Sequence, residues 1–107
     1  MPEEALLVYC TVPSQKVGKD IASELVRKKL AACCNIIPGL ISIYEWNNNV
    51  EEDEELLLLI KTTVEVYPKL EKTISALHPY DVPEIISTKI HSGLESYLKW
   101  LNETTKG

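Results

Sequence analysis

The chain has 107 residues, 45% of them hydrophobic and 25% charged, and its formal net charge at pH 7 is −5. This length and composition fit one globular domain over residues 1–107, and the acidic balance argues against a nucleic acid as partner. No apolar run approaches the ~20 residues that a membrane-spanning helix needs, so we expect no membrane span.

The first strand and helix are clear in the residue pattern. Residues 6–12 are mostly apolar or β-branched and end at Pro13, which predicts a buried strand. Ser14 can then cap a helix, because its side chain can accept a hydrogen bond from the first turn. The apolar residues that follow recur at helical spacing and predict one buried face. They are Val17, Ile21, Ala22, Leu25, Val26 and Leu30.

A long β-hairpin is predicted in the middle of the chain. Residues 33–46 alternate between the two faces of a strand, and Pro38-Gly39 interrupts them in a way that suggests a bulge or bend. Three asparagines at residues 47–49 supply a tight turn, since Asn tolerates a positive φ better than most residues. Residues 50–63 continue as the partner strand, acidic at first and then apolar.

Two helices and one more strand complete the chain. Pro68 fits the first turn of a helix, and His78-Pro79 ends it because proline disfavours helical dihedrals in the preceding residue. Residues 84–90 predict a strand, and the apolar residues from Leu94 to Leu101 predict a short C-terminal helix. The apolar face of the earlier helix consists of Tyr67, Leu70, Ile74 and Leu77.

The predicted order is β-α-β-β-α-β-α. It indicates the α+β class, as the ferredoxin-like split β-α-β fold with an added C-terminal helix. In the commonest sheet order for this arrangement, the fourth strand lies beside the first, and the third lies between the first and the second.

The length of the hairpin points to assembly. About 14 residues per arm would extend ~45 Å at the rise of a β-strand, further than a compact domain of this size. The tip would expose Tyr44, Trp46 and strand edges. Either the strands are shorter and fold back on their own core, or the arms pair with neighbouring subunits in a closed oligomer. We favour the oligomer.

Motifs of the common enzyme classes are missing. The sequence has no GxxxxGK[ST] phosphate loop and no GxGxxG, GxSxG, HExxH or CxxC motif. Only His78 and His91 could act as bases near neutral pH, so we expect a protein that is not an enzyme. Three cysteines, an odd number, and an N-terminus without the features of a secretory signal favour a cytoplasmic location.

One candidate metal site follows from the predicted topology. If the first and fourth strands are antiparallel neighbours, Cys10 lies near Glu84, and His78 enters from the preceding turn. A thiolate and an imidazole suit copper or zinc. The alternative is structural, because Cys10 shares a face with apolar residues and fits as a small buried side chain. In that case His78 interacts with the helix C-terminus and Glu84 accepts a hydrogen bond.

Two further clusters are better explained by structure. The run Glu51–Glu55 could bind a hard cation or a partner, but alternation divides it between two strand faces, which favours a solvated strand start. Cys33 and Cys34 are adjacent and therefore point to opposite faces of a strand, which argues against a chelate.

Several segments together resemble the CutA family of divalent-cation tolerance proteins. The resemblance covers almost the whole chain and includes the signature His78-Pro79-Tyr80-Asp81-Val82-Pro83-Glu84. The other matching segments are residues 8–13, 30–38, 42–46, 51–55 with 60–62, and the closing Tyr97-Leu98-x-Trp100.

This resemblance implies a function as well as a fold. It implies a small cytosolic homotrimer that is joined through the long hairpin and is similar in architecture to PII signalling proteins. It also implies a link to tolerance of copper and other divalent cations. Cys10, His78 and Glu84 match the copper ligands proposed for the family. The alternative is a PII-like module that binds a small ligand or a protein partner at clefts between subunits. An enzyme with Cys10 as nucleophile and His78 as base is disfavoured, because nothing supplies an oxyanion or cofactor site.

Overall fold

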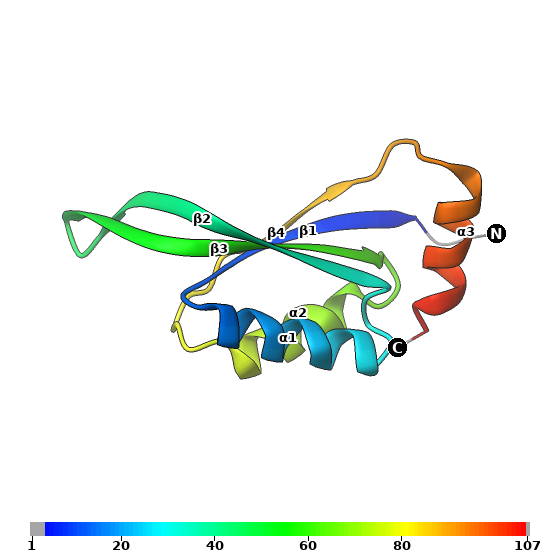
Figure 1. Ribbon diagram of the computed structural model, residues 1–107, viewed down its shortest axis with the longest axis horizontal. Helices are drawn as coiled ribbons and strands as arrows, with labels where there is room; N and C mark the ends of the chain where they lie inside the picture. The colour runs from blue at the N-terminus through cyan, green and yellow to red at the C-terminus, as the bar shows by residue number, and fades with distance from the viewer. Residues whose placement is uncertain (1–3, 107) are drawn as a thin grey trace.

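The computed structural model describes residues 4–106, which form a four-stranded sheet and three helices (Figure 1). All three neighbouring strand pairs are antiparallel, in the order β2-β3-β1-β4, which confirms the predicted fold and sheet order. The elements are β1 (Ala5–Val12), α1 (Gln15–Arg27), β2 (Cys33–Trp46), β3 (Asn49–Thr63), α2 (Tyr67–Leu77), β4 (Ile85–Lys89) and α3 (Glu95–Thr104).

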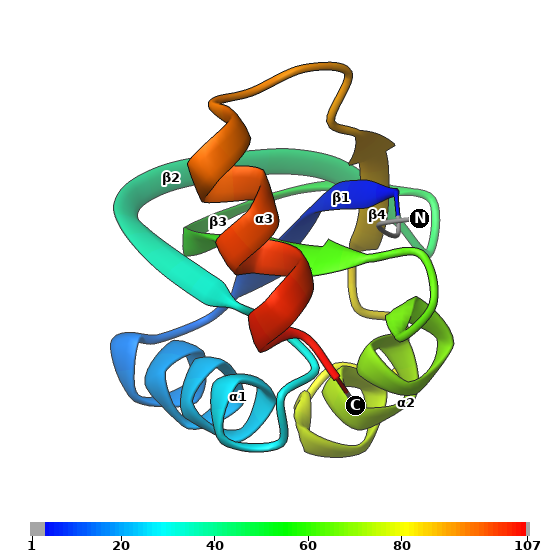
Figure 2. The same cartoon turned by 90° about the vertical axis from the view of Figure 1, so that its right-hand side faces the viewer.

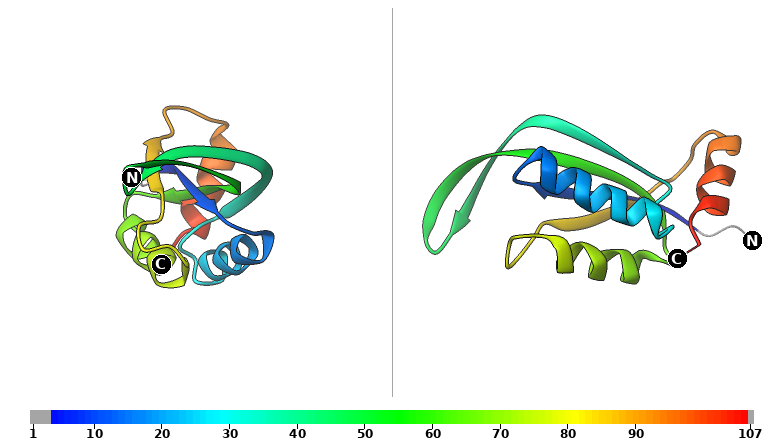
Figure 3. Two further views of the ribbon diagram at one scale, coloured as in Figure 1. Left: turned by 90° about the vertical axis from the view of Figure 1, so that its left-hand side faces the viewer. Right: turned by 60° about the horizontal axis from the view of Figure 1, so that its bottom comes forward.

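Two layers make up the body of the domain, and the hairpin extends beyond them. Helices α1 and α2 lie side by side against one face of the sheet, and α3 lies across the end opposite the hairpin tip (Figures 1 and 2). The hairpin curves as it leaves this body (Figure 3). The domain consequently measures 47 × 25 × 22 Å, so the long hairpin predicted from the sequence is present.

Local sequence signals explain where the helices begin and end. The side chain of Ser14 accepts a hydrogen bond from the backbone N–H of Val17 at 3.2 Å and caps α1. Pro68 lies in the first turn of α2, and His78 ends this helix. No helix among residues 4–106 is long and apolar enough to cross a membrane.

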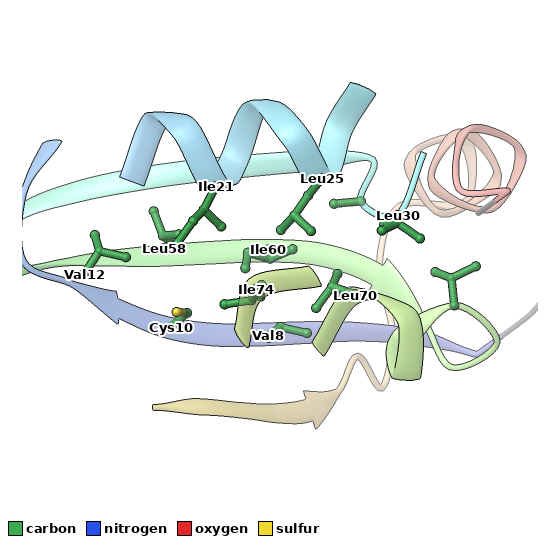
Figure 4. Packing of buried hydrophobic residues seen from close by; sticks show 12 residues of the cluster. Val8, Cys10, Val12, Ile21, Leu25, Leu30, Leu58, Ile60, Leu70 and Ile74 are labelled. Carbon is green, nitrogen blue, oxygen red and sulfur yellow. The ribbon is translucent and has the colours of Figure 1, made fainter. Parts of the chain in front are cut away.

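The core lies between the sheet and the pair α1 and α2. Figure 4 shows Ile21 and Leu25 of α1 together with Ile74 of α2 among the side chains that converge on the sheet. Gly18 allows α1 to approach closely, because a Cβ at this position would lie 3.2 Å from Cγ2 of Val12. The fully buried apolar residues on the sheet side are Val8, Cys10, Val12, Leu58 and Ile60.

Two predicted core positions are exposed in the structure, and a third is buried as predicted but lies outside its predicted helix. Val26 is 42% exposed and Leu77 46% exposed, so each lies at the edge of its helix face. Leu30 is buried but lies beyond the end of α1, where Lys29 adopts a positive φ of 61°. This left-handed residue turns the chain back, and the backbone N–H of Leu30 then bonds the carbonyl of Leu25 at 2.9 Å.

The hairpin strands have 14 and 15 residues, so the alternative of shorter strands is wrong. The register shifts between Ile37 and Leu40, which is the bulge expected at Pro38-Gly39. Asn47 and Asn48 have positive φ values of 51° and 67° and form the predicted turn.

Candidate functional site

The three predicted metal ligands lie at the same end of the sheet. In the register of β1 and β4, Cys10 is opposite Ile85. Glu84 is the residue just before Ile85 in the chain and therefore lies at the same end of the sheet. Nε2 of His78 lies 2.8 Å from the carbonyl oxygen of Thr11, the residue after Cys10. The backbone neighbourhood predicted from the topology is therefore present.

The side chains of these three residues nevertheless point to different places. Cys10 has no exposed surface and lies in the core beside Val8 (Figure 4), whereas Glu84 is exposed. Burial, followed by the negative charges of Glu84 and Glu55, raises the pKa of the Cys10 thiol to about 12. The thiol donates a weak hydrogen bond to the carbonyl of Thr11 over 3.7 Å.

Both ring nitrogens of His78 already have partners. Nε2 faces a carbonyl oxygen, which can only accept, and Nδ1 faces the backbone N–H of Tyr80 at 3.2 Å, which can only donate. These contacts assign the neutral tautomer with the proton on Nε2. No group of three or more His, Cys, Asp or Glu side chains within residues 4–106 is arranged to hold a metal ion. In this conformation the three predicted ligands do not fit a metal centre, and their assignment stays a prediction.

A groove of about 660 Å³ lies beside this region. Strand β1 ends at Val12, opposite Leu56, so the part of β3 that precedes Leu56 has no partner on that side. Residues 80–84 pass this part of the hairpin and form one wall of the groove, and residues 42–44, 46, 53 and 55 form the other. The connection between α2 and β4 can be followed near the base of the hairpin in Figure 1.

Two tyrosine–carboxylate pairs bridge or line this groove. The hydroxyl of Tyr80 donates to Oε2 of Glu55 at 2.8 Å and so joins the two walls. The hydroxyl of Tyr44 donates to the carboxylate of Asp53 on the hairpin wall. Together we call Tyr44, Asp53, Glu55 and Tyr80 the phenol–carboxylate cluster.

The cluster keeps its phenols protonated. The hydrogen bond to Asp53 raises the pKa of Tyr44 to about 12, because it stabilises the neutral phenol. Burial and then the bond to Glu55 raise the pKa of Tyr80 above its usual value. The Tyr80 ring also packs at a tilt against that of His78, with 4.7 Å between their centroids.

The structure confirms the prediction for the acidic run Glu51–Glu55 only in part. Its predicted division between two faces is confirmed, because Asp53 and Glu55 line the groove whereas Glu54 does not. The expectation of a solvated strand start is wrong for Glu55, which is only 6% exposed. The usable signal was the two-residue spacing of Asp53 and Glu55, which places both on one face.

The adjacent cysteines behave as predicted for a strand. Cys34 packs against the core, and burial raises its pKa to about 12. Cys33 is opposite Lys61 in the register of β2 and β3 and lies on the other face of the sheet. Cys10, Cys33 and Cys34 are all free thiols.

Comparison with known proteins gives a consistent result. The family model described as CutA1 divalent ion tolerance protein matches residues 6–104. The divalent-cation tolerance protein CutA of Thermus thermophilus is 54% identical over 103 residues, which cover 96% of this chain and 98% of that protein. The chloroplastic CutA protein of Arabidopsis thaliana is 45% identical, over 95% of this chain but only 56% of that protein. This chain thus spans a little over half the length of that plant relative.

Solved structures agree with this result. The structure of the T. thermophilus protein superposes with a TM-score of 0.94 at 53% identity, covering 95% of this chain and 99% of that one. CutA1 of Oryza sativa gives a TM-score of 0.95 at 42% identity, covering 98% and 96%. The structure from Archaeoglobus fulgidus, which is 34% identical with a TM-score of 0.92 and covers 95% and 99%, is described as periplasmic. The cytoplasmic location expected from the sequence therefore stays a prediction. The chain itself belongs to the CutA1 family of divalent ion tolerance proteins.

Proposed function

We propose that this protein acts in divalent-cation tolerance as a homotrimer that is joined through its hairpin and binds copper or another divalent cation. The observation that carries the proposal is the exposed apolar face of the hairpin. Ile41 is 61% exposed, Ile43 67% and Val50 79%. We call these three residues the hairpin apolar face. A surface of this kind is typical of a contact between proteins.

Charge supports the cation part of the proposal. Each chain carries −5, so three chains together carry about −15, and a strongly acidic assembly concentrates cations near its surface. The family description names tolerance and no reaction, which supports a role other than catalysis. Copper is the proposed ion, and Cys10, His78 and Glu84 remain the residues to test.

The first experiment measures assembly. Light scattering after gel filtration should give a mass of about 36 kDa, three times the 12.1 kDa of one chain. A mass of one chain at micromolar protein concentration would contradict the proposed trimer.

The second experiment measures copper binding. We expect a copper titration of the reduced protein to show saturable binding that the double variant Cys10→Ser, His78→Ala weakens. Cys33→Ser is the matched control, since that thiol lies on the other face of the sheet. Unchanged copper affinity in the double variant would exclude Cys10 and His78 as ligands.

The groove favours a second candidate function. Its volume of about 660 Å³ lies within the range of small-molecule sites. We therefore retain the part of the PII-like alternative in which a small ligand or a protein partner is bound, and we place this binding in a groove of one chain, whereas the resemblance implied clefts between subunits. Thermal stabilisation by nucleotides or small metabolites, without stabilisation by copper, would favour this alternative.

A further inference from the structure

The groove carries negative charge without a basic residue to balance it. Four carboxylates line it, those of Asp53, Glu55, Asp81 and Glu84, and its described lining contains no Lys, Arg or His. The phenols of the phenol–carboxylate cluster are neutral hydrogen-bond donors and leave this charge in place. The chemistry of the lining therefore selects for a cation.

Glu55 is the least solvated of these carboxylates. It is 6% exposed, and among residues 4–106 its side chain has one hydrogen bond, from Tyr80, and takes part in no ion pair. A carboxylate has about four lone-pair directions, so the phenol satisfies only part of this group. A cation that enters the groove would pair with this carboxylate where little water screens the attraction between the two charges.

The rest of the lining distinguishes an organic cation from a metal ion. A hard metal ion needs several oxygen ligands that converge, and no such group is present within residues 4–106. The groove instead carries the aromatic rings of Tyr44, Trp46 and Tyr80, and aromatic faces attract alkylammonium groups. Its volume of about 660 Å³ also exceeds what a single ion requires.

We propose that the groove binds a small organic cation with an alkylammonium group, which is held by the phenol–carboxylate cluster. Glu55 supplies the buried counter-charge, and the rings of Tyr44 and Tyr80 contact the alkyl groups on the nitrogen. The proposal names the ligand of the small-ligand alternative and depends on it. It does not depend on a trimer or on copper.

Choline and its neutral analogue 3,3-dimethylbutan-1-ol test the proposal, because they share a shape and differ in charge. In calorimetric titrations of the full chain, we expect choline to bind saturably with a Kd on the order of 1 mM or tighter. The neutral alcohol should bind at least ~tenfold more weakly, since it lacks the charge. Absence of saturable choline binding, or equal binding of the two compounds, would overturn the proposal.

A matched pair of variants locates the site. Glu55→Gln should weaken choline binding about tenfold. Glu54→Gln is the control, because it removes the same charge from a neighbouring exposed residue on the opposite face of the strand, and it should change choline binding less than about twofold. Equal losses in the two variants would overturn the proposal. If Glu55→Gln fails to fold in a thermal melt, Asp53→Asn replaces it with the same expected direction.

A third probe separates the proposal from hard-cation binding. Magnesium chloride that bound more tightly than choline and lost its affinity in Glu55→Gln would assign the groove to a metal ion and overturn the proposal. On the same samples, light scattering tests the proposed trimer and a copper titration tests the proposed copper site. Failure of choline binding is therefore distinguishable from failure of the proposed function.

Discussion

The buried thiol of Cys10 makes the stability of the protein sensitive to alkaline pH. Its pKa is 9.0 when unfolded and about 12 in the folded chain, because burial disfavours the thiolate. A group with a raised folded pKa stabilises the fold below the unfolded pKa, and this contribution is lost as pH rises towards the folded value. The loss should therefore fall between about pH 9 and pH 12.

The magnitude follows from proton linkage. At pH 11 the unfolded thiol is almost fully ionised and the folded thiol is mostly protonated, which gives about 2–3 kcal/mol of lost stability relative to pH 8. Cys10→Ala lacks this titration. The stability difference between the wild-type protein and Cys10→Ala should therefore shrink by about 2–3 kcal/mol between these two pH values.

Urea unfolding followed by circular dichroism measures this difference. All samples need a reductant and one fixed protein concentration, because assembly would otherwise change the apparent stability. Val8→Ala, which removes a buried apolar group from the same strand, is the control, and its effect should not depend on pH. If the effect of Cys10→Ala were also independent of pH, the thiol would not be buried as described.

Three further changes test the surfaces and the packing. Ile43→Glu with Val50→Glu should reduce the mass in light scattering to about 12.1 kDa without loss of helical signal, and an unchanged mass would contradict the role of the hairpin apolar face. Thr62→Val should lower the free energy of unfolding by about 1–3 kcal/mol, because the carbonyl of Leu30 loses the hydroxyl that donates to it at 2.6 Å; a difference near zero in urea unfolding would contradict this. Gly18→Val should cost about 2 kcal/mol through crowding against Val12, so a raised urea midpoint would be the contrary result.

Most of the fold was predictable because its signals are local. Ser14, Pro68 and His78-Pro79 mark helix ends through backbone chemistry that acts within a few residues, and the three asparagines mark the hairpin turn in the same way. The spacing of Leu30 continues the apolar stripe and therefore predicts a helical residue. In the structure the positive φ of Lys29 places Leu30 outside the helix, and no residue type in that segment signals such a turn.

The candidate site was less predictable because it depends on contacts distant in sequence. Sheet order brought Cys10 and Glu84 together correctly at the level of the backbone. Alternation along β1 nevertheless directs the Cys10 side chain into the core, as the structural alternative required. The bond between Glu55 and Tyr80 joins residues 25 positions apart, and it forms because β1 ends before this part of β3.

The bulge in β2 explains how one hairpin carries two different surfaces. Before the bulge, Ile37 pairs with Leu57, so odd-numbered residues of the two strands share a face. After it, Leu40 pairs with Glu55, so even-numbered residues of β2 share a face with odd-numbered residues of β3. This one-residue insertion places Tyr44 on the face of Asp53 and directs the hairpin apolar face to the other side. A continuous register would exchange the two sets, putting isoleucines beside the carboxylates of the groove. The irregularity at Pro38-Gly39 therefore turns Ile41 and Val50 of the proposed assembly surface away from the proposed ligand site, whereas Ile43 lies at the border and also lines the groove.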